Sequence, residues 1–355
     1  MKNALDVFRN KKVLVTGDTG FKGSWLSYWL HHLGADVYGF ALPPERPFDH
    51  FPSLGLAKLI HHKDGDIRDF AAIRHFMQET KPEFVFHLAA QPLVRRSYKE
   101  PRLTFDTNIG GTVNVLDSVR ETPSVRSLVT ITSDKCYLNK EWHWGYREND
   151  ELGGKDPYSA SKAAAEMVFA AYQASYFQDR PGFGAVSVRA GNVIGGGDWS
   201  ADRIVPDCIR ALQEDQPIEL RSPYATRPWQ HVLEPLSGYL LTASKLYENP
   251  EKYRGSYNFG PESREIHTVE DVAQNLIDAW GSGEIRVTRK PTDPPEAGLL
   301  HLSCDKAHQV LGWYPRWSFT KTVQETAGWY RRVRDGEPVA SVTRQQIIEY
   351  MECES

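Results

Sequence analysis

The stretch Val13-Leu14-Val15-Thr16-Gly17-Asp18-Thr19-Gly20-Phe21-Lys22-Gly23 decides the fold. An apolar, β-branched run leads into three glycines spaced three apart, and an amphipathic segment over 24–33 follows, which predicts a strand, a tight turn and a helix. Gly17 permits the sharp turn, Gly20 lets the backbone approach a pyrophosphate, and Gly23 lets the helix pack closely on the strand. The free N–H groups at the start of the helix favour phosphate, Lys22 adds a positive charge, and Asp18 opposes it. The stretch therefore predicts a dinucleotide-binding turn.

Composition is that of an ordinary globular protein with a full core. The 355 residues are 40% hydrophobic and 25% charged, which predicts one large or two medium domains. A net charge of −4 gives no electrostatic reason to expect a nucleic acid or an anionic membrane as partner. There is no run of 18 apolar residues and no charged-then-apolar leader, so we expect a cytoplasmic protein. The four cysteines are scattered without a CxxC pair, which argues against a disulfide framework or a zinc site, and we expect no metal.

Strands and helices alternate along the chain. Strands are predicted over 36–42, 59–62, 84–90, 128–133, 185–189 and 257–260, with helices over 70–80, 104–121 and 158–176 between them. This alternation predicts an α/β fold with a doubly wound parallel sheet, the Rossmann architecture. Further helices are predicted over 203–212, 269–280 and 320–334, a strand over 285–289, and a peripheral tail after Gly336 with a short helix over 345–351.

We expect this alternation to divide into two domains. The dinucleotide-binding domain comprises 1–192 plus about 231–262. A smaller mixed α/β domain for the substrate comprises 193–230 plus about 263–340, and 341–355 form the tail.

Several positions predict how a dinucleotide would lie on the sheet. The small residues Ala89 and Ala90, at the carboxyl end of the buried strand over 84–90, leave room for a cofactor beside Leu88. The second strand ends without the acidic residue that favours NAD. Glu45 and Arg46 follow it and favour opposite cofactors, so this position does not decide between NAD and NADP. Asp66 either accepts from the adenine amino group or caps the next helix.

Two groups of polar residues indicate a catalytic site. Ser133-Asp134-Lys135 follows a central strand, at the sheet edge where ligands bind in open α/β folds. Asp156 and Pro157 then start a helix that places Tyr158 and Lys162 four apart on one face. An ammonium group close to a phenol lowers the phenol's pKa from about 10, so Tyr158 is expected to act as a base near neutral pH.

With the glycine triplet and His87-Leu88-Ala89-Ala90, these residues resemble the extended short-chain dehydrogenase/reductase family. The resemblance implies that Ser133 orients a substrate hydroxyl, Tyr158 is the acid/base, and Lys162 tunes Tyr158 and holds the nicotinamide ribose. Ser133-Asp134-Lys135, the segment 189–199 and the segment 227–232 are similar to the nucleotide-sugar 4,6-dehydratases, in particular the branch that acts on CDP-glucose. This resemblance implies bound NAD and a role in deoxysugar and O-antigen precursor synthesis. It also implies a homodimer or homotetramer assembled through the helices over 104–121 and 158–176.

The resemblance also implies the binding residues. Those expected to bind the cofactor are Gly17, Gly20, Phe21, Lys22, Gly23, Asp66, Ile67, Leu88, Ala89, Ala90, Thr107, Tyr158 and Lys162. Those expected to bind the nucleotide sugar are Gln91, Ser133, Asn192, Arg203, Arg221 and Arg227, where the arginines have the chemistry of a diphosphate clamp.

The implied reaction is an internal oxidation, loss of water and reduction. Tyr158 takes the proton of the C4 hydroxyl, a base removes the C5 proton, and Asp134 protonates the departing C6 hydroxyl. Most nucleotide-sugar 4,6-dehydratases have Glu at the place of Lys135, so Lys135 is either a neutral base favoured by burial or a fixed charge that stabilises the enolate. Within the family a 4-epimerase is the alternative, because it needs no acid at Asp134. A non-catalytic dinucleotide sensor is the alternative of another class, and it has no need for both Tyr158 and Lys162.

Overall fold

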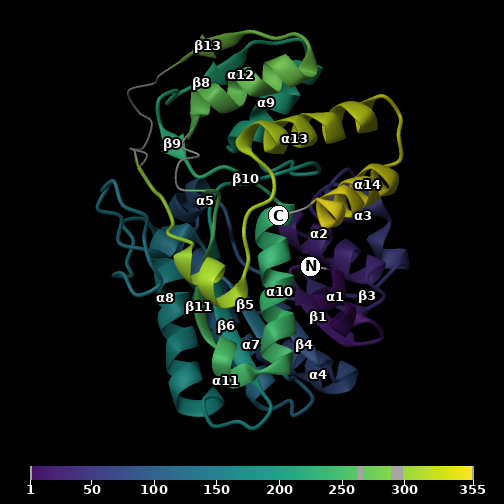
Figure 1. Cartoon of the computed structure of the whole chain (residues 1–355), viewed down its shortest axis with the longest axis vertical. Coiled ribbons are helices and arrows are strands. Elements are labelled where there is room, and N and C mark those ends of the chain that lie inside the picture. The colour runs from purple at the N-terminus through teal and green to yellow at the C-terminus, as the bar shows by residue number, and fades with distance from the viewer. Residues whose placement is uncertain (1, 263–266, 289–298, 354–355) are drawn as a thin grey trace.

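A computed structural model describes residues 2–262, 267–288 and 299–353. Its centre is a seven-stranded parallel sheet in the order β11-β6-β5-β4-β1-β2-β3 (Figure 1). The strands are β1 (Lys12–Thr16), β2 (Asp36–Ala41), β3 (His61–Asp64), β4 (Phe84–His87), β5 (Ser127–Ile131), β6 (Gly184–Ala190) and β11 (Gly255–Phe259). Strand order reverses between β1 and β4, which confirms the predicted doubly wound sheet and marks the crevice where such sheets bind ligands.

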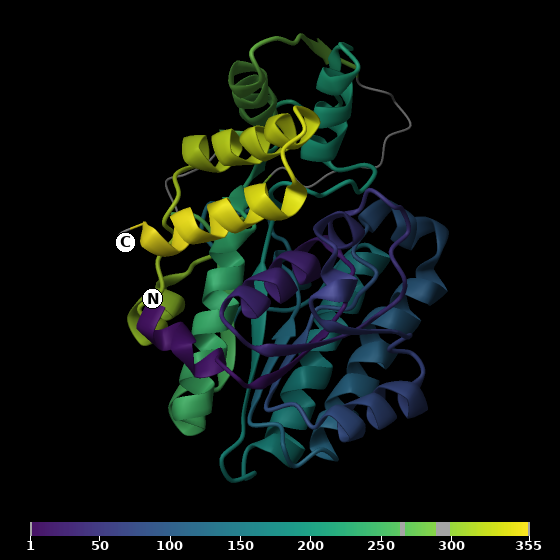
Figure 2. The same cartoon turned by 90° about the vertical axis from the view of Figure 1, so that its right-hand side faces the viewer.

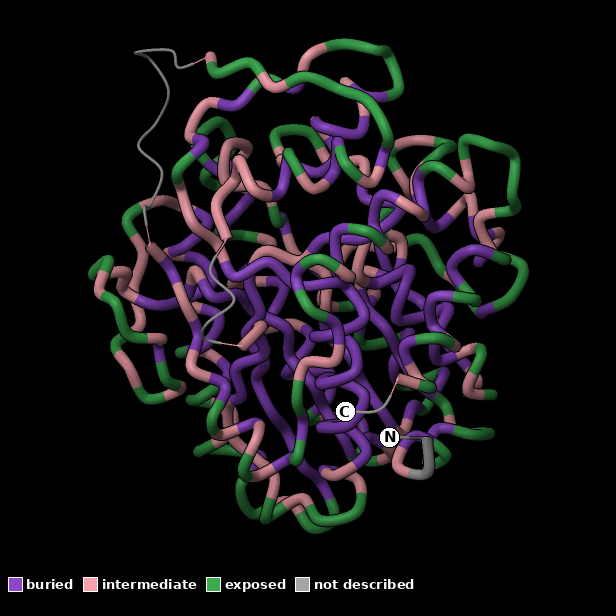
Figure 3. The backbone as a smooth tube through the Cα atoms, turned by 45° about the horizontal axis from the view of Figure 1, so that its top comes forward, coloured by how far each residue is buried: buried purple, intermediate pink, exposed green. Residues whose placement is uncertain are grey.

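Alternate residues of β1 serve opposite faces of the sheet, as the pleat requires. Val13 and Val15 belong to a buried cluster with helices α2 (Phe21–His32) and α10 (Leu233–Glu248). Leu14 belongs to a second buried cluster with α4 (Phe70–Thr80), α7 (Gly111–Arg120) and α8 (Pro157–Tyr172). Helices therefore cover both faces, and the strands between them form the buried interior of the backbone (Figures 2 and 3).

Local sequence explains where the helices begin. Asp156 caps α8 by accepting from the Ser159 N–H, and Pro157 is its first residue. The predicted helix over 104–121 is one run made of α6 (Pro101–Phe105), a π-helical turn (Asp106–Gly110) and α7. A second π-helical turn (Gln173–Phe177) extends α8. The short helices are α1 (Lys2–Leu5), η1 (Asp6–Phe8), α3 (His50–Leu54), η2 (Leu56–Lys58), α5 (Val94–Lys99), η4 (Asp134–Cys136), α11 (Pro250–Tyr253) and η6 (Ala307–Leu311).

The remaining elements gather at one end of the molecule, at the top of Figure 1. Short strands tie them together: β7 with β10, β9 with β12, and β8 with β13. Their bounds are β7 (Val193–Ile194), α9 (Ile204–Gln213), β8 (Ile218–Leu220), β9 (Thr226–Arg227), β10 (Gln230–His231), β12 (His267–Thr268), α12 (Val269–Trp280), β13 (Ile285–Val287) and α13 (Phe319–Arg334). Arg289, the predicted end of the strand over 285–289, lies outside the described residues. The predicted division into two domains stays a prediction.

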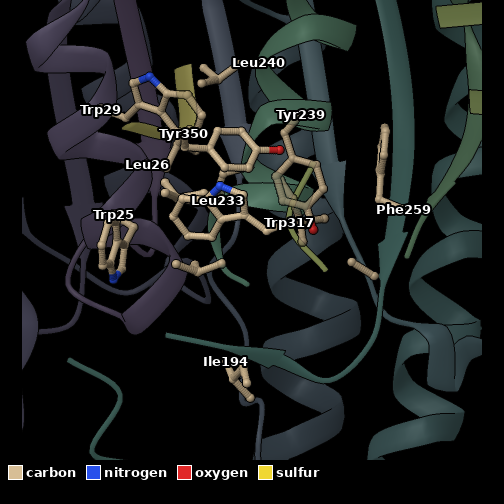
Figure 4. Close-up of a cluster of buried hydrophobic side chains, with 14 of the residues drawn as sticks. Trp25, Leu26, Trp29, Ile194, Leu233, Tyr239, Leu240, Phe259, Trp317 and Tyr350 are labelled. Carbon is tan, nitrogen blue, oxygen red and sulfur yellow. The ribbon is translucent and has the colours of Figure 1, made fainter. Parts of the chain in front are cut away.

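Two helices correct the sequence predictions. Helix α10 was not predicted, because Pro235 and Gly238 interrupt its pattern, yet Pro235 lies in the first turn, where proline is tolerated. The tail is not peripheral: α14 (Val339–Glu352) is twice the length of the expected helix and packs against α2 and α3. Its Tyr350 lies among Trp29, Leu233 and Trp317 (Figure 4). In the described part of the chain, every helix is too short or too polar to cross a membrane.

Candidate active site

A cavity of about 1350 Å³ opens beyond the carboxyl ends of the central strands. The segments that follow β1, β4, β5 and β6 each contribute to one side of it, and α9, β8 and their loops contribute to the other. The sequence-predicted residues in its lining are Phe21, Lys22, Leu88, Ala90, Ser133, Asp134, Lys135, Tyr158, Lys162, Asn192, Arg203, Arg221 and Arg227. The topology therefore brings most of the predicted site into one space.

The glycine turn has the form of a dinucleotide cradle. Gly17 has φ +77°, and a Cβ there would lie 2.7 Å from the backbone nitrogen of Ala89. A Cβ on Gly23 would lie 2.0 Å from the Gly17 carbonyl oxygen, so only glycine lets α2 approach β1 this closely. Gly20 precedes α2 without a side-chain cap, which leaves the first N–H groups of the helix for an anion. These residues fit a dinucleotide pyrophosphate.

The two charges of this turn lie elsewhere than expected. Asp18 is fully buried and accepts a hydrogen bond from His62, with 2.7 Å between Oδ2 and Nδ1, so its charge faces β3. Lys22 lines the main cavity, and its Nζ lies 6.0 Å from the ring centre of Tyr239 on α10. Desolvation, with repulsion from Lys162 and Arg203, lowers the pKa of Lys22 to about 7. The charge of Lys22 therefore interacts with the residues at the catalytic end of the cavity.

A second, smaller cavity contains Asp66, Arg68 and Asn114. Asp69, one of its lining residues, caps α4 through the Ala72 N–H, so Asp66 is not the cap and the adenine alternative remains for it. Asp66 is held by Arg68, whose Nε donates to Oδ2 over 2.9 Å.

Besides the three glycines of the turn, four predicted residues do not appear in the linings of these two cavities. Ile67 fills the space over Gly111, and Ala89 lies against Gly17. Thr107 is half-buried on the π-helical turn. The side chain of Gln91 is engaged within the fold: its amide group donates to the Leu93 carbonyl and to Thr104. This engagement leaves Gln91 outside the cavity that the sequence predicted it would share with substrate.

Ser133 and Asp134 form the acidic side of the main cavity. The Ser133 hydroxyl donates to Asp134 Oδ1 over 2.9 Å, and its oxygen is left to accept from the Tyr158 phenol. Asp134 is 1% exposed, and its Oδ2 has no partner among the described residues. A Cβ on Gly191 would lie 2.1 Å from that oxygen, so the glycine makes room for the carboxyl group. Asp134 itself lines the cavity, so its carboxyl group lies where it can exchange a proton with a ligand.

The pKa of Tyr158 is shifted in the opposite direction to the one expected from the sequence. Burial raises the pKa of Tyr158 to about 12, and the Ser133 hydrogen bond only partly opposes it. Lys162 does not compensate, because its ammonium faces the Ile131 carbonyl at 3.5 Å and burial lowers its own pKa to about 8. Burial therefore opposes the expected effect of Lys162 on the pKa of the phenol, and the role of Tyr158 as a base near neutral pH stays a prediction.

Lys135 remains at the rim of the cavity. Its side chain is 31% exposed, and its Nζ lies 4.0 Å from Asp134 Oδ1. The burial that a neutral lysine base requires is not present, which favours the alternative of a fixed charge beside Asp134.

A buried network behind the cavity supports Lys162 and was not predicted. Glu166, one turn after Lys162, pairs with Arg189 on β6 at 2.7 Å and attracts the Lys162 charge. The hydroxyl groups of Thr132 and Ser187 also bond to Glu166. The sequence did contain a signal for this network, because 158, 162 and 166 follow at intervals of four on one helical face. A buried acid at the third of these positions requires a cation from a neighbouring element, here the sheet.

The predicted arginine clamp is held by acids of this chain. Arg203 pairs with Asp198 at 3.0 Å. Asp202 lies 3.2 Å from Arg95 and 3.8 Å from Arg221, and all three line the cavity. Neither Arg95 nor Asp202 was predicted, because contact between α5 and the loop before α9 depends on the tertiary fold. Within the described residues, no group of three or more His, Cys, Asp or Glu is placed to hold a metal ion.

Comparisons with known proteins agree with this arrangement. A profile of the family described as GDP-mannose 4,6 dehydratase matches residues 14–326. A CDP-glucose 4,6-dehydratase of Salmonella typhimurium is 46% identical over 97% of both chains.

Solved structures share the fold. A UDP-glucose 4-epimerase of Thermus thermophilus in complex with NAD has a TM-score of 0.76 at 26% identity, covering 90% of this chain and 99% of that one. A dTDP-glucose 4,6-dehydratase of Streptomyces venezuelae has a TM-score of 0.77 at 22% identity, covering 91% and 98%.

Proposed function

Because the chain belongs to the GDP-mannose 4,6-dehydratase family of extended short-chain dehydrogenases/reductases, we propose that it converts CDP-glucose to CDP-4-keto-6-deoxyglucose and water. The chain is a nucleotide-sugar 4,6-dehydratase, and its cofactor is NAD. The choice of CDP-glucose is supported by the 46% identity to the Salmonella enzyme. The product is a precursor for deoxysugars, and we extend the proposal to those of bacterial O-antigens.

One observation favours dehydration over 4-epimerisation. Asp134 lines the cavity and is buried, its Oδ2 has no hydrogen-bond partner among the described residues, and it directly follows Ser133, the neighbour of Tyr158. A 4-epimerase has no leaving group to protonate, whereas a dehydratase needs an acid at the C6 hydroxyl. The intact Tyr158 and Lys162 in the same cavity likewise argue against a non-catalytic sensor.

The glycine turn, Asp66 and Lys162 are the groups that would hold NAD, which when bound supplies a reversible two-electron carrier. Tyr158, as the phenolate, accepts the proton of the C4 hydroxyl, and the Ser133 hydroxyl stabilises that phenolate when its proton turns from Asp134 to Tyr158. Ketone formation at C4 makes the C5 proton acidic; the Asp134 carboxylate accepts that proton, and the Lys135 charge beside it stabilises the enolate that forms. Asp134 donates its proton to the C6 hydroxyl, which departs as water. Arg203, Arg221 and Arg227 would bind the substrate diphosphate.

The proposal is tested with a panel of NDP-glucoses, assayed with and without added NAD. We expect CDP-glucose to give a 4-keto-6-deoxy sugar, seen by its absorbance in base and by loss of 18 mass units, the mass of one water. Conversion of CDP-glucose to CDP-galactose would instead identify the 4-epimerase. Preference for the UDP or dTDP sugar would retain the dehydratase and overturn the nucleobase assignment.

We also propose that the chain assembles as a homodimer or homotetramer through the helices over 101–120 and 157–177. Phe105, Met167 and Tyr176 on these helices are exposed, which supports burial in a subunit contact. Sedimentation equilibrium tests this: a monomer at micromolar concentration would contradict it.

A further inference from the structure

Lys22 lines the active-site cavity, and the reaction above gives it no role. It lies in the glycine turn, where a cation was expected to bind pyrophosphate. Its side chain instead reaches the end of the cavity that contains the proton-transfer residues. The charged and titratable groups that face it are Lys162 on α8, Arg203 before α9, Asp134 on η4 and Tyr239 on α10. Asp134 is the one acid among them, so the surroundings of Lys22 hold more positive than negative charge.

The redox end of the cofactor must also lie here. The phenol of Tyr158 takes a proton from the C4 hydroxyl, so the group that receives the C4 hydrogen has to contact the same carbon. The oxidised nicotinamide is a cation and the reduced ring is neutral, whereas the diphosphate carries the same charge in both forms. A nearby ammonium group therefore affects the two forms differently only if it acts on the ring.

We propose that Lys22 is a positioning charge beside the nicotinamide, which weakens binding of NAD⁺ relative to NADH and so favours oxidation of the sugar. This inference rests on the proposed function, because it requires that the cavity bind NAD. Repulsion from a partly desolvated ammonium group makes bound NAD⁺ a better oxidant without any contact with the sugar. Lys22 is well suited to this because its pKa of about 7 leaves a substantial charged fraction at neutral pH.

The experiment measures dissociation constants of the full-length protein for NAD⁺ and NADH separately, by calorimetry at pH 6.5. Lys22→Met is expected to lower the ratio Kd(NAD⁺)/Kd(NADH) about tenfold, the effect of one charge roughly 10 Å away at an effective dielectric constant of about 20. Lys22→Gln should do the same, while Lys22→Arg keeps the charge and the ratio. Lys155→Met is the matched control, because Lys155 is an exposed lysine at the rim of the same cavity.

A second arm repeats the comparison at pH 8.5. Lys22 is then mostly neutral, so wild type and Lys22→Met should converge, and any contribution of Lys162 is common to both proteins. Equal weakening of both cofactor forms by Lys22→Met would place the charge at the pyrophosphate and overturn the inference, as would an unchanged ratio. Failure of the wild-type protein to bind either form would instead overturn NAD as its cofactor.

Discussion

At the scale of single residues, Ser133 is the neighbour that opposes the effect of burial on Tyr158. Ser133→Ala should raise the pKa of Tyr158 further, because the phenolate loses its hydrogen bond. Since Tyr158 acts as a base, the acidic limb of kcat/KM against pH should move to higher pH, with activity at pH 7 reduced about tenfold or more. Ser133→Thr keeps a hydroxyl group on an extended backbone and should keep the limb in place. An unmoved limb in Ser133→Ala would show that Ser133 only orients substrate.

Lys135 is tested by changing its charge and its basicity separately. If Lys135 is a fixed charge, Lys135→Arg should retain much of the activity, because a guanidinium stays protonated and cannot act as a base. Lys135→Met should lose about a hundredfold, a loss typical of removing one stabilising group. The direct measurement is exchange of the C5 proton with deuterium from solvent. Exchange at the wild-type rate in Lys135→Met would exclude both roles.

At the scale of elements, the contact between α2 and β1 depends on Gly23. Gly23→Ala places a methyl group 2.0 Å from the Gly17 carbonyl oxygen, and backbone has to move to relieve it. We expect a loss of about 2 kcal/mol in the free energy of unfolding, measured with urea, and loss of NAD binding. Gly328→Ala on α13 is the control: its Cβ meets nothing within 4 Å, and alanine in a helix should add about 1 kcal/mol. Unchanged NAD affinity in Gly23→Ala would contradict the cradle.

Elements with a regular pattern could be predicted from sequence, whereas properties set by tertiary contact could not. The glycine triplet predicted the strand, turn and helix around β1, and Asp156-Pro157 predicted the start of α8. Helix α10 was missed because its proline and glycine weaken the local signal, although its packing against the sheet more than offsets them. The pKa direction of Tyr158 and the placement of Lys22 depend on how deeply each is buried, and spacing alone contains no information on depth.

At the scale of the whole molecule, Glu234 joins α10 to the C-terminal segment. It accepts from the backbone N–H groups of Arg316 and Trp317, at 3.0 and 2.8 Å, and from the Tyr350 hydroxyl at 2.6 Å. These bonds connect the helix behind the sheet to the start of α13 and to α14. Burial nevertheless raises the pKa of Glu234 from 4.5 to about 7.

This raised pKa predicts a stability change with a definite sign. Between about pH 4.5 and 7 the unfolded chain ionises Glu234 while the folded protein keeps it protonated, so the free energy of unfolding falls as pH rises. The full fall is about 3 kcal/mol, complete above pH 7. Glu234→Gln does not titrate, so the stability difference between wild type and variant should shrink from pH 5 to pH 8. Urea unfolding at several pH values measures it, and a constant difference would contradict the shift.

Asp202 forms ion pairs with an arginine from each of the two parts of the molecule that enclose the cavity. Arg95 extends from α5, beside the sheet, and Arg221 follows β8 on the opposite side. The aspartate is 47% exposed and has φ +61°, a backbone conformation that non-glycine residues adopt rarely. Its carboxylate occupies guanidinium groups that a substrate diphosphate would also seek.

Asp202 is therefore expected to compete with the substrate for these arginines. Asp202→Asn removes the competing charge, so KM for CDP-glucose should fall a few-fold with little change in kcat. The effect is small because a half-exposed ion pair contributes under about 1 kcal/mol, and it should diminish at high salt. Asp335→Asn is the control, since Asp335 is an exposed acid paired with Arg334 on α13 and does not line the cavity. A higher KM in Asp202→Asn would show instead that the carboxylate binds the substrate itself, and the bridge to Arg95 and Arg221 would then serve to hold it in place.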